Sequence, residues 1–110
     1  LDVPAVRYSG TAPRIKRVAV CGGAGIFLKK SAVKAGADAF VTADIKYHDF
    51  FTEKDKFLLI DAGHYETEIP VIEAIRQELS EAFEQIRVQA TECVTNPMNI
   101  YISDSQNKNI

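Results

Sequence analysis

Short apolar runs alternate with amphipathic segments along this chain. Three of the runs are continuous, which is typical of strands buried on both faces of a sheet: residues 18–21, 39–42 and 57–60. Residues 86–94 instead alternate apolar and polar side chains, so we expect a strand with one solvated face, nearer an edge of the sheet. Shorter strands are expected near residues 5–8 and 98–103.

Two amphipathic segments predict helices. The first ends naturally at Gly36, and its apolar face is formed by Phe27, Leu28, Ala32 and Ala35. The second contains Pro70, which a helix tolerates only in its first turn, so we expect it to begin near residues 66–68, with Thr67 as a possible cap. Its apolar face is formed by Ile72, Ile75, Leu79 and Phe83. Residues 45–52, between the two, are expected to form one or two helical turns.

This alternation of strands and helices predicts an α/β fold. We expect a layered α/β sandwich with a largely parallel or mixed sheet of about four to six strands, flanked by helices. The length of 110 residues suits one domain, residues 1–110, with a polar tail from Asp104 that frays. Because the chain opens on Leu1 rather than Met, we expect it to be a fragment.

Composition and charge narrow the classes of function. A net charge of −2 with scattered basic residues argues against a nucleic-acid partner. No apolar run is long enough to span a membrane, and no signal-peptide pattern opens the chain. Cys21 and Cys93 both lie in apolar stretches, so we expect buried, reduced cysteines in strands rather than a disulfide. These features favour a cytoplasmic protein.

The candidate chemistry follows the three predicted buried strands. A glycine-rich segment, residues 22–25, follows the first strand, residues 44–48 follow the second, and residues 61–68 follow the third. In a parallel sheet the carboxyl ends of the strands meet at one edge, where ligands bind. Both histidines of the chain, His48 and His64, belong to this set. The sequence therefore predicts a functional site at this edge.

His64 and Glu68 stand four residues apart, on one face of a helix if the helix begins early. Imidazole nitrogen and carboxylate oxygen suit a divalent metal, although the spacing alone favours a surface ion pair. Zinc takes about three or four protein ligands. Asp44, His48 and Cys21 could add to the pair, but their spacing does not require it. For His48, a partly buried histidine bonded to a backbone carbonyl is an equal alternative.

The glycine-rich segment, residues 22–25, also suits an anion-binding loop. However, Leu28 stands where a dinucleotide fingerprint needs glycine, and Lys29 where a Walker loop needs it. We therefore favour a tight strand-to-helix turn with close packing. No serine or cysteine stands in a pattern typical of a catalytic triad.

Three motifs stand in one order and spacing: VAVCGGAG at 18–25, TADIKYHD at 42–49 and DAGHYETE at 61–68, with Thr95-Asn96-Pro97 near the end. Together they resemble the C-terminal portion of the Nif-three-like proteins, known in bacteria as GTP cyclohydrolase 1 type 2 homologues. The resemblance spans residues 6 to 101. Ala43 and Ala24 depart from the glycine and serine of many relatives, and neither replaces a ligand of the family.

The resemblance implies a dinuclear centre between two related α/β halves, with two divalent ions (zinc, manganese, iron or magnesium) per full-length subunit. His64 and Glu68 would be the metal ligands from the C-terminal half. The other ligands, a His pair and an Asp, would come from an N-terminal half that this chain does not contain. We therefore expect the chain to be the C-terminal half of a two-half metal protein, with an incomplete site that binds metal weakly or not at all.

The function implied is a metal-dependent hydrolase acting on a nucleotide-like or other phosphorylated small molecule. His48 would be the catalytic proton shuttle or a substrate contact, and Asp44 would orient a ligand. The alternative is a non-catalytic metal-binding scaffold or a regulatory protein-interaction domain. The resemblance also implies a homo-oligomer, and neither nucleic acid nor membrane is an expected partner. For this chain alone, a stable but inactive half-site is a further alternative.

Overall fold

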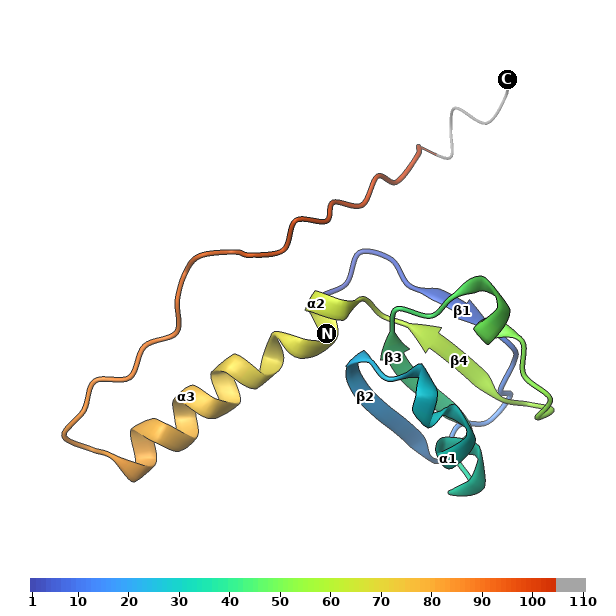
Figure 1. Cartoon of the computed structure of the whole chain (residues 1–110), viewed down its shortest axis with the longest axis horizontal. Helices are drawn as coiled ribbons and strands as arrows, with labels where there is room; N and C mark the ends of the chain where they lie inside the picture. The colour runs from blue at the N-terminus through green and yellow to red at the C-terminus, as the bar shows by residue number, and fades with distance from the viewer. Residues whose placement is uncertain (105–110) are drawn as a thin grey trace.

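A computed structural model describes residues 1–104 and contains a four-stranded mixed sheet (Figure 1). Its strands are β1 (Arg7–Ser9), β2 (Val18–Ala24), β3 (Ala39–Ala43) and β4 (Leu58–Asp61), in the spatial order β1-β4-β3-β2. β2, β3 and β4 are parallel, and β1 runs antiparallel to β4. The predicted α/β fold with a mixed sheet is confirmed.

The strands β2, β3 and β4 lie where the apolar runs predicted them, but β2 is less buried than predicted. β3 is buried along nearly its whole length, as a central strand should be. β2 lies at the edge of the sheet, and one of its faces leaves Val18 and Val20 exposed. The prediction that β2 is buried on both faces is wrong, because only one face of the sheet carries a packed layer in the described part of the chain.

That packed layer is formed by short helical segments. η1 (Ile26–Leu28) leads into α1 (Lys29–Lys34), and η2 (Tyr47–Phe50) forms the turn expected after β3. Gly36 ends the first helical segment with φ +80°, a conformation that glycine adopts without strain. Beneath this layer lies the core, made of Ala32, Ala37, Phe40, Ile45, Phe57 and Leu59.

The segment after β4 forms two consecutive helices, α2 (His64–Glu68) and α3 (Pro70–Ala82). The helical segment therefore starts earlier than predicted, and Pro70 opens the second helix in the position where proline is tolerated. Gly63, with φ +92°, precedes α2 in the capping position. The proposed cap Thr67 is wrong, because its hydroxyl lies inside α2 and donates to the Gly63 carbonyl at 2.8 Å.

α3 projects away from the sheet, and the chain beyond it follows an irregular path (Figure 1). The strands predicted at 86–94 and 98–103 are absent from the described structure, because neither segment reaches a sheet edge where a strand could pair. Cys93 is consequently exposed rather than buried in a strand, whereas Cys21 lies in β2 and is half-buried. The predicted polar tail beyond Asp104 lies outside the described residues.

Among residues 1–104, no helix combines the length and the apolar character needed to cross a membrane.

Candidate metal site

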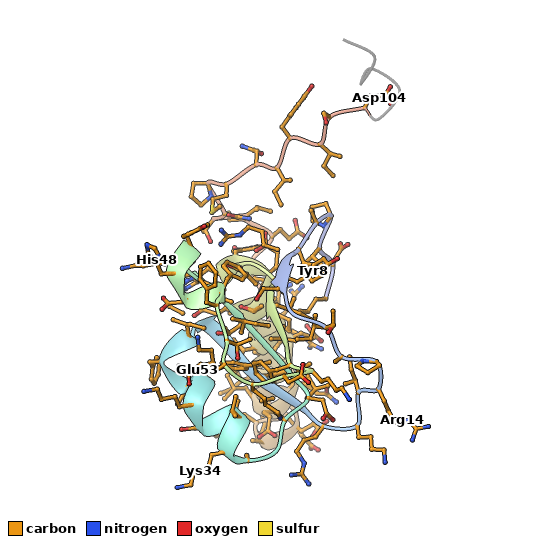
Figure 2. All side chains as sticks on the ribbon, turned by 90° about the vertical axis from the view of Figure 1, so that its right-hand side faces the viewer. Tyr8, Arg14, Lys34, His48, Glu53 and Asp104 are labelled. Atoms are coloured by element: carbon orange, nitrogen blue, oxygen red, sulfur yellow. The ribbon has the colours of Figure 1, made fainter. Side chains whose placement is uncertain are left out.

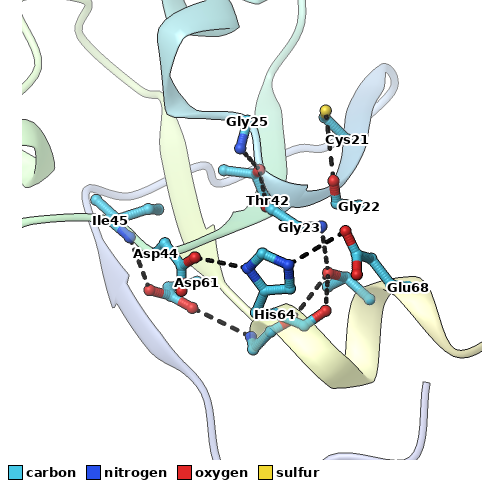
Figure 3. Close-up of polar contacts among 12 residues, drawn as sticks. Cys21, Gly22, Gly23, Gly25, Thr42, Asp44, Ile45, Asp61, His64 and Glu68 are labelled. Carbon is cyan, nitrogen blue, oxygen red and sulfur yellow. Dashed lines mark hydrogen bonds and ion pairs between the residues drawn. The ribbon is translucent and has the colours of Figure 1, made fainter.

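The carboxyl ends of the parallel strands bring together side chains from distant parts of the sequence (Figure 3). Asp44 directly follows β3, and His64, which begins α2, is the third residue after β4. α2 lies against β2 and β3, so Glu68 reaches the glycine segment at the end of β2. The structure therefore places Asp44, His64 and Glu68 in one cluster.

The His64 ring is held between two carboxylates. Its Nδ1 lies 2.6 Å from Asp44 Oδ2, and its Nε2 lies 3.2 Å from Glu68 Oε1. The hydrogen bond to Asp44, helped by the negative charge of Glu68, raises the pKa of His64 above the ordinary value of 6.5. All three side chains are about half exposed to solvent, so the cluster is accessible from outside.

The backbone around Asp44 and His64 is unusual. Asp44 has φ +55°, a left-handed conformation that aspartate tolerates better than most residues. The loop that follows β3 and the loop that follows β4 both donate backbone hydrogen bonds to Asp61. Asp61 is the last residue of β4 and is 6% exposed. Its Oδ2 accepts the Ile45 N–H at 3.1 Å and its Oδ1 accepts the Gly63 N–H at 3.1 Å. Asp61 also forms an ion pair with Arg7 of β1.

Glycine is required where β2 meets α2. A Cβ on Gly23, which has φ +69°, would overlap the Glu68 carboxylate and lie 3.3 Å from His64 Nε2. A Cβ on Gly22 would lie 2.9 Å from the Thr67 carbonyl oxygen. The Gly23 N–H donates to Thr67 Oγ1 at 2.8 Å. The close packing predicted for this segment is present, although the glycines extend β2 itself rather than forming only a turn.

A cavity of about 460 Å³ opens beside the cluster. His64 and Asp44 line it together with Arg7 and two residues of the C-terminal segment, Met98 and Ile100. In the same segment Asn96 donates its side-chain amide to Glu66 Oε1 at 3.4 Å. Local sequence does not predict the position of Thr95-Asn96-Pro97, and the structure brings this motif back beside the start of α2.

Two other candidate site residues, His48 and Cys21, lie away from the cluster of Asp44, His64 and Glu68. His48 stands on η2, points outward at the surface (Figure 2), and meets the Tyr47 ring edge-on at 5.1 Å. It is not among the residues that line the cavity beside His64. Cys21 faces the packed layer against the core. Within residues 1–104, no set of three or more His, Cys, Asp or Glu side chains is arranged to hold a metal ion.

The spacing of the ion pair between His64 and Glu68 is compatible with two ligands of one ion. Donor atoms at the usual distances from tetrahedral zinc lie roughly 3.4 Å apart, close to the 3.2 Å between Nε2 and Oε1. Metal-binding histidines commonly donate their second ring N–H to a carboxylate, the position that Asp44 occupies. The missing Cβ of Gly23 leaves room for the Glu68 carboxylate beside His64 Nε2. These residues fit a divalent metal as a partial ligand set.

Comparison with known proteins gives a consistent result. The family model for Duf34/NIF3 (NGG1p interacting factor 3) matches residues 1–97. The GTP cyclohydrolase 1 type 2 homolog of Staphylococcus aureus strain MSSA476 is 40% identical over 103 residues, covering 88% of this chain and 28% of the relative. The homolog of Staphylococcus epidermidis strain ATCC 12228 is 38% identical with the same coverage. The chain therefore spans less than a third of the length of these relatives.

Solved structures of Duf34/NIF3 relatives also resemble this chain. The crystal structure of Staphylococcus aureus protein SA1388 matches with a TM-score of 0.80 and 37% identity, over 91% of this chain and 34% of that one. A Bacillus cereus protein related to NIF3 matches with a TM-score of 0.75 over 91% of this chain and 29% of that one; its 24% identity supports the fold alone. The chain belongs to the Duf34/NIF3 family.

Proposed function

We propose that this chain contributes one His–Glu ligand pair, His64 and Glu68, to the divalent metal centre of a metal-dependent hydrolase. The observation that carries the proposal is the convergence of His64 Nε2 and Glu68 Oε1, 3.2 Å apart, next to Gly23, where the absence of a side chain lets the carboxylate approach. A histidine and a carboxylate are ordinary ligands for zinc, manganese or iron, and the carboxylate also suits magnesium.

The residues of the chain have separate tasks in this proposal. Asp44 accepts a hydrogen bond from the Nδ1–H of His64, which leaves the Nε2 lone pair, on the side of Glu68, available to a metal. Glu68 supplies negative charge on the same side. A divalent ion, when bound, lowers the pKa of a coordinated water to near neutrality and so makes a hydrolytic nucleophile available.

The proposal extends to the whole protein, which we expect to be longer than this chain and to form a homo-oligomer. Two ligands are too few for a complete centre, so the remaining ligands come from elsewhere in the protein, in a site with two ions. The relatives' printed name, GTP cyclohydrolase 1 type 2 homolog, supports a nucleotide-like or other phosphorylated substrate. His48, accessible on η2, is proposed as the proton shuttle or substrate contact.

The metal site is tested by removing each ligand in the full protein encoded by the gene. Because His64→Ala removes a nitrogen donor and Glu68→Gln removes the negative charge of the carboxylate, each should weaken zinc binding by at least roughly 10-fold, measured by competition with a chromogenic chelator. His48→Ala is the matched control and should bind zinc as the parent does while losing turnover. The proposal is wrong if the His64→Ala variant folds and binds zinc with the parent's affinity.

A second candidate function is a metal-binding scaffold or regulatory interaction domain without turnover. The observation that favours it is the family description itself, which names an interacting factor. Under this alternative, His64→Ala would release the metal, and the parent protein would hydrolyse no nucleotide or phosphorylated compound in any metal form. Turnover that disappears with His64 would decide for the hydrolase.

A further inference from the structure

Asp61 stands at the centre of the bonds that hold the two loops of the site. We propose that Asp61 is a positioning residue for the metal pair and that Arg7 holds it in place. The inference rests on the proposed metal site and deepens it: Asp61 touches neither His64 nor Glu68, yet its two oxygens determine where Asp44 and His64 lie relative to each other.

The first step is the sharing of one carboxylate between two loops. Oδ2 of Asp61 accepts the backbone N–H of Ile45, the residue after Asp44. Oδ1 accepts the N–H of Gly63, the residue before His64. The two bonds have the same length, 3.1 Å, and start from a rigid planar group at the end of β4 (Figure 3). A displacement of either loop therefore stretches a bond to the same side chain.

The second step is the strain in these loops. Asp44, with φ +55°, and Gly63, with φ +92°, occupy left-handed backbone conformations. For a residue with a side chain, such a conformation persists only where surrounding contacts over-determine it. At Asp44 those contacts are the hydrogen bond that Asp61 accepts from the next residue, Ile45, and the ion pair of Asp44 with His64.

The third step is the charge of Asp61. A carboxylate that is only 6% exposed needs a compensating partner, since an isolated buried charge is costly. β1 pairs with β4 in a register that places Arg7 opposite Asp61. The Arg7 guanidinium contacts Asp61 Oδ2 and also donates to the Ile45 carbonyl at 3.3 Å. Ile45 is therefore held at both its N–H and its carbonyl, and the edge strand β1 supports the site.

The chain offers a matched control for this arrangement. Asp38, just before β3, also accepts two backbone N–H groups, from Lys16 and Arg17, both at 2.9 Å. It ties two segments together at the other end of the sheet, away from His64. Both bonds reach the same oxygen, Oδ2, so Asp38→Asn removes a carboxylate charge that also holds two segments, without disturbing the metal pair.

The experiment compares Asp61→Asn with Asp38→Asn in the full protein encoded by the gene. Asparagine at 61 cannot accept on both sides, so one loop should be released. For folded protein we expect zinc affinity to fall about 10- to 100-fold in Asp61→Asn and to stay at the parent's value in Asp38→Asn, by chelator competition. The ¹⁵N resonances of the His64 ring, a signature that a merely structural role would not move, should shift only in Asp61→Asn.

Arg7→Gln keeps the proposal testable if Asp61→Asn does not fold. Arg7 is mostly exposed, so its replacement is tolerated more easily, and it should weaken zinc binding in the same direction by a smaller factor, with Arg7→Lys restoring part of the loss. Parental zinc affinity in every folded variant at positions 61 and 7 would overturn the positioning role. If His64→Ala also kept zinc, the metal site itself would be wrong; if only His64→Ala lost it, the positioning role alone would fail.

Discussion

At the scale of single residues, the site depends on the absence of a Cβ atom at Gly23. Gly23 has a positive φ and stands where any side chain would collide with Glu68 and approach His64 Nε2. The glycine is therefore explained by the close approach of β2 to α2, and an anion-binding loop is not needed to account for it.

Gly23→Ala should damage the site more than the fold. The new Cβ forces the Glu68 carboxylate away from His64, so we expect zinc affinity to fall at least roughly 10-fold. The left-handed backbone adds a loss of about 1–3 kcal/mol in the free energy of unfolding. Chelator competition and urea unfolding measure the two effects.

Gly36→Ala is the control for Gly23→Ala. Gly36 has a similar φ of +80°, and the nearest atom to its new Cβ would be the end of the flexible Arg17 side chain at 3.0 Å. It should lose similar stability and keep the parent's zinc affinity. Equal zinc affinity in both variants would contradict the role given to Gly23.

At the scale of elements, the hydrogen bonds of Asp38 join the segments that precede β2 and β3, and they make the stability of the fold depend on pH. The N–H groups of Lys16 and Arg17, just before β2, donate to this carboxylate and lower the pKa of Asp38 below its ordinary value of 3.8. A group whose folded pKa is lowered stabilises the fold above its unfolded pKa. That contribution disappears as the pH falls through the lowered folded value.

The free energy of unfolding of Asp38→Asn should therefore depend less on acid than that of the parent. Above about pH 4 the parent should be the more stable protein, since its ionised carboxylate accepts both N–H groups more strongly than a neutral amide oxygen would. As the pH falls toward 2 the parent should lose this advantage. Urea unfolding at intervals from pH 6 to pH 2 measures the difference, and a gap that stays constant over that range would contradict the assignment.

At the scale of the whole molecule, the core is one-sided. The helical layer covers one face of the sheet, while apolar residues on β2 and α3 remain exposed. The Cα radius of gyration is 17.6 Å, against about 13 Å for a compact domain of this size. The excess comes from α3 and the segment after it, which extend beyond the sheet (Figure 1). Stability should therefore reside in residues beneath the helical layer.

Two phenylalanines test where stability resides. Phe40 is 1% exposed at the centre of the core, so Phe40→Ala should lower the free energy of unfolding by about 3–5 kcal/mol. Phe27 is 77% exposed on η1, and Phe27→Ala should change it by no more than about 0.5 kcal/mol. Urea titrations followed by circular dichroism give both values. Similar losses in the two variants would show that the core lies elsewhere.

The parts of the fold that could be predicted from the sequence are those decided by neighbouring residues. The apolar runs located β2, β3 and β4, Gly36 marked a helix end, and Pro70 marked the first turn of α3. The strand predicted at 86–94 failed because alternation describes a face that could be buried, whereas a strand also needs a partner edge. The sequence of the segment does not show whether a sheet edge is available for pairing.

The candidate site also has some features that local sequence predicts and others that depend on the tertiary structure. The sequence by itself determined that His64 and Glu68 share a helical face and that three strand ends carry polar or glycine residues, because both follow from local periodicity and chain order. Only the tertiary structure decided that Asp44 holds His64, that β2 needs glycine there, and that Arg7 and Asp61, 54 residues apart, support the loops. These depend on hydrogen bonds between distant segments, whose partners are chosen when the sheet assembles.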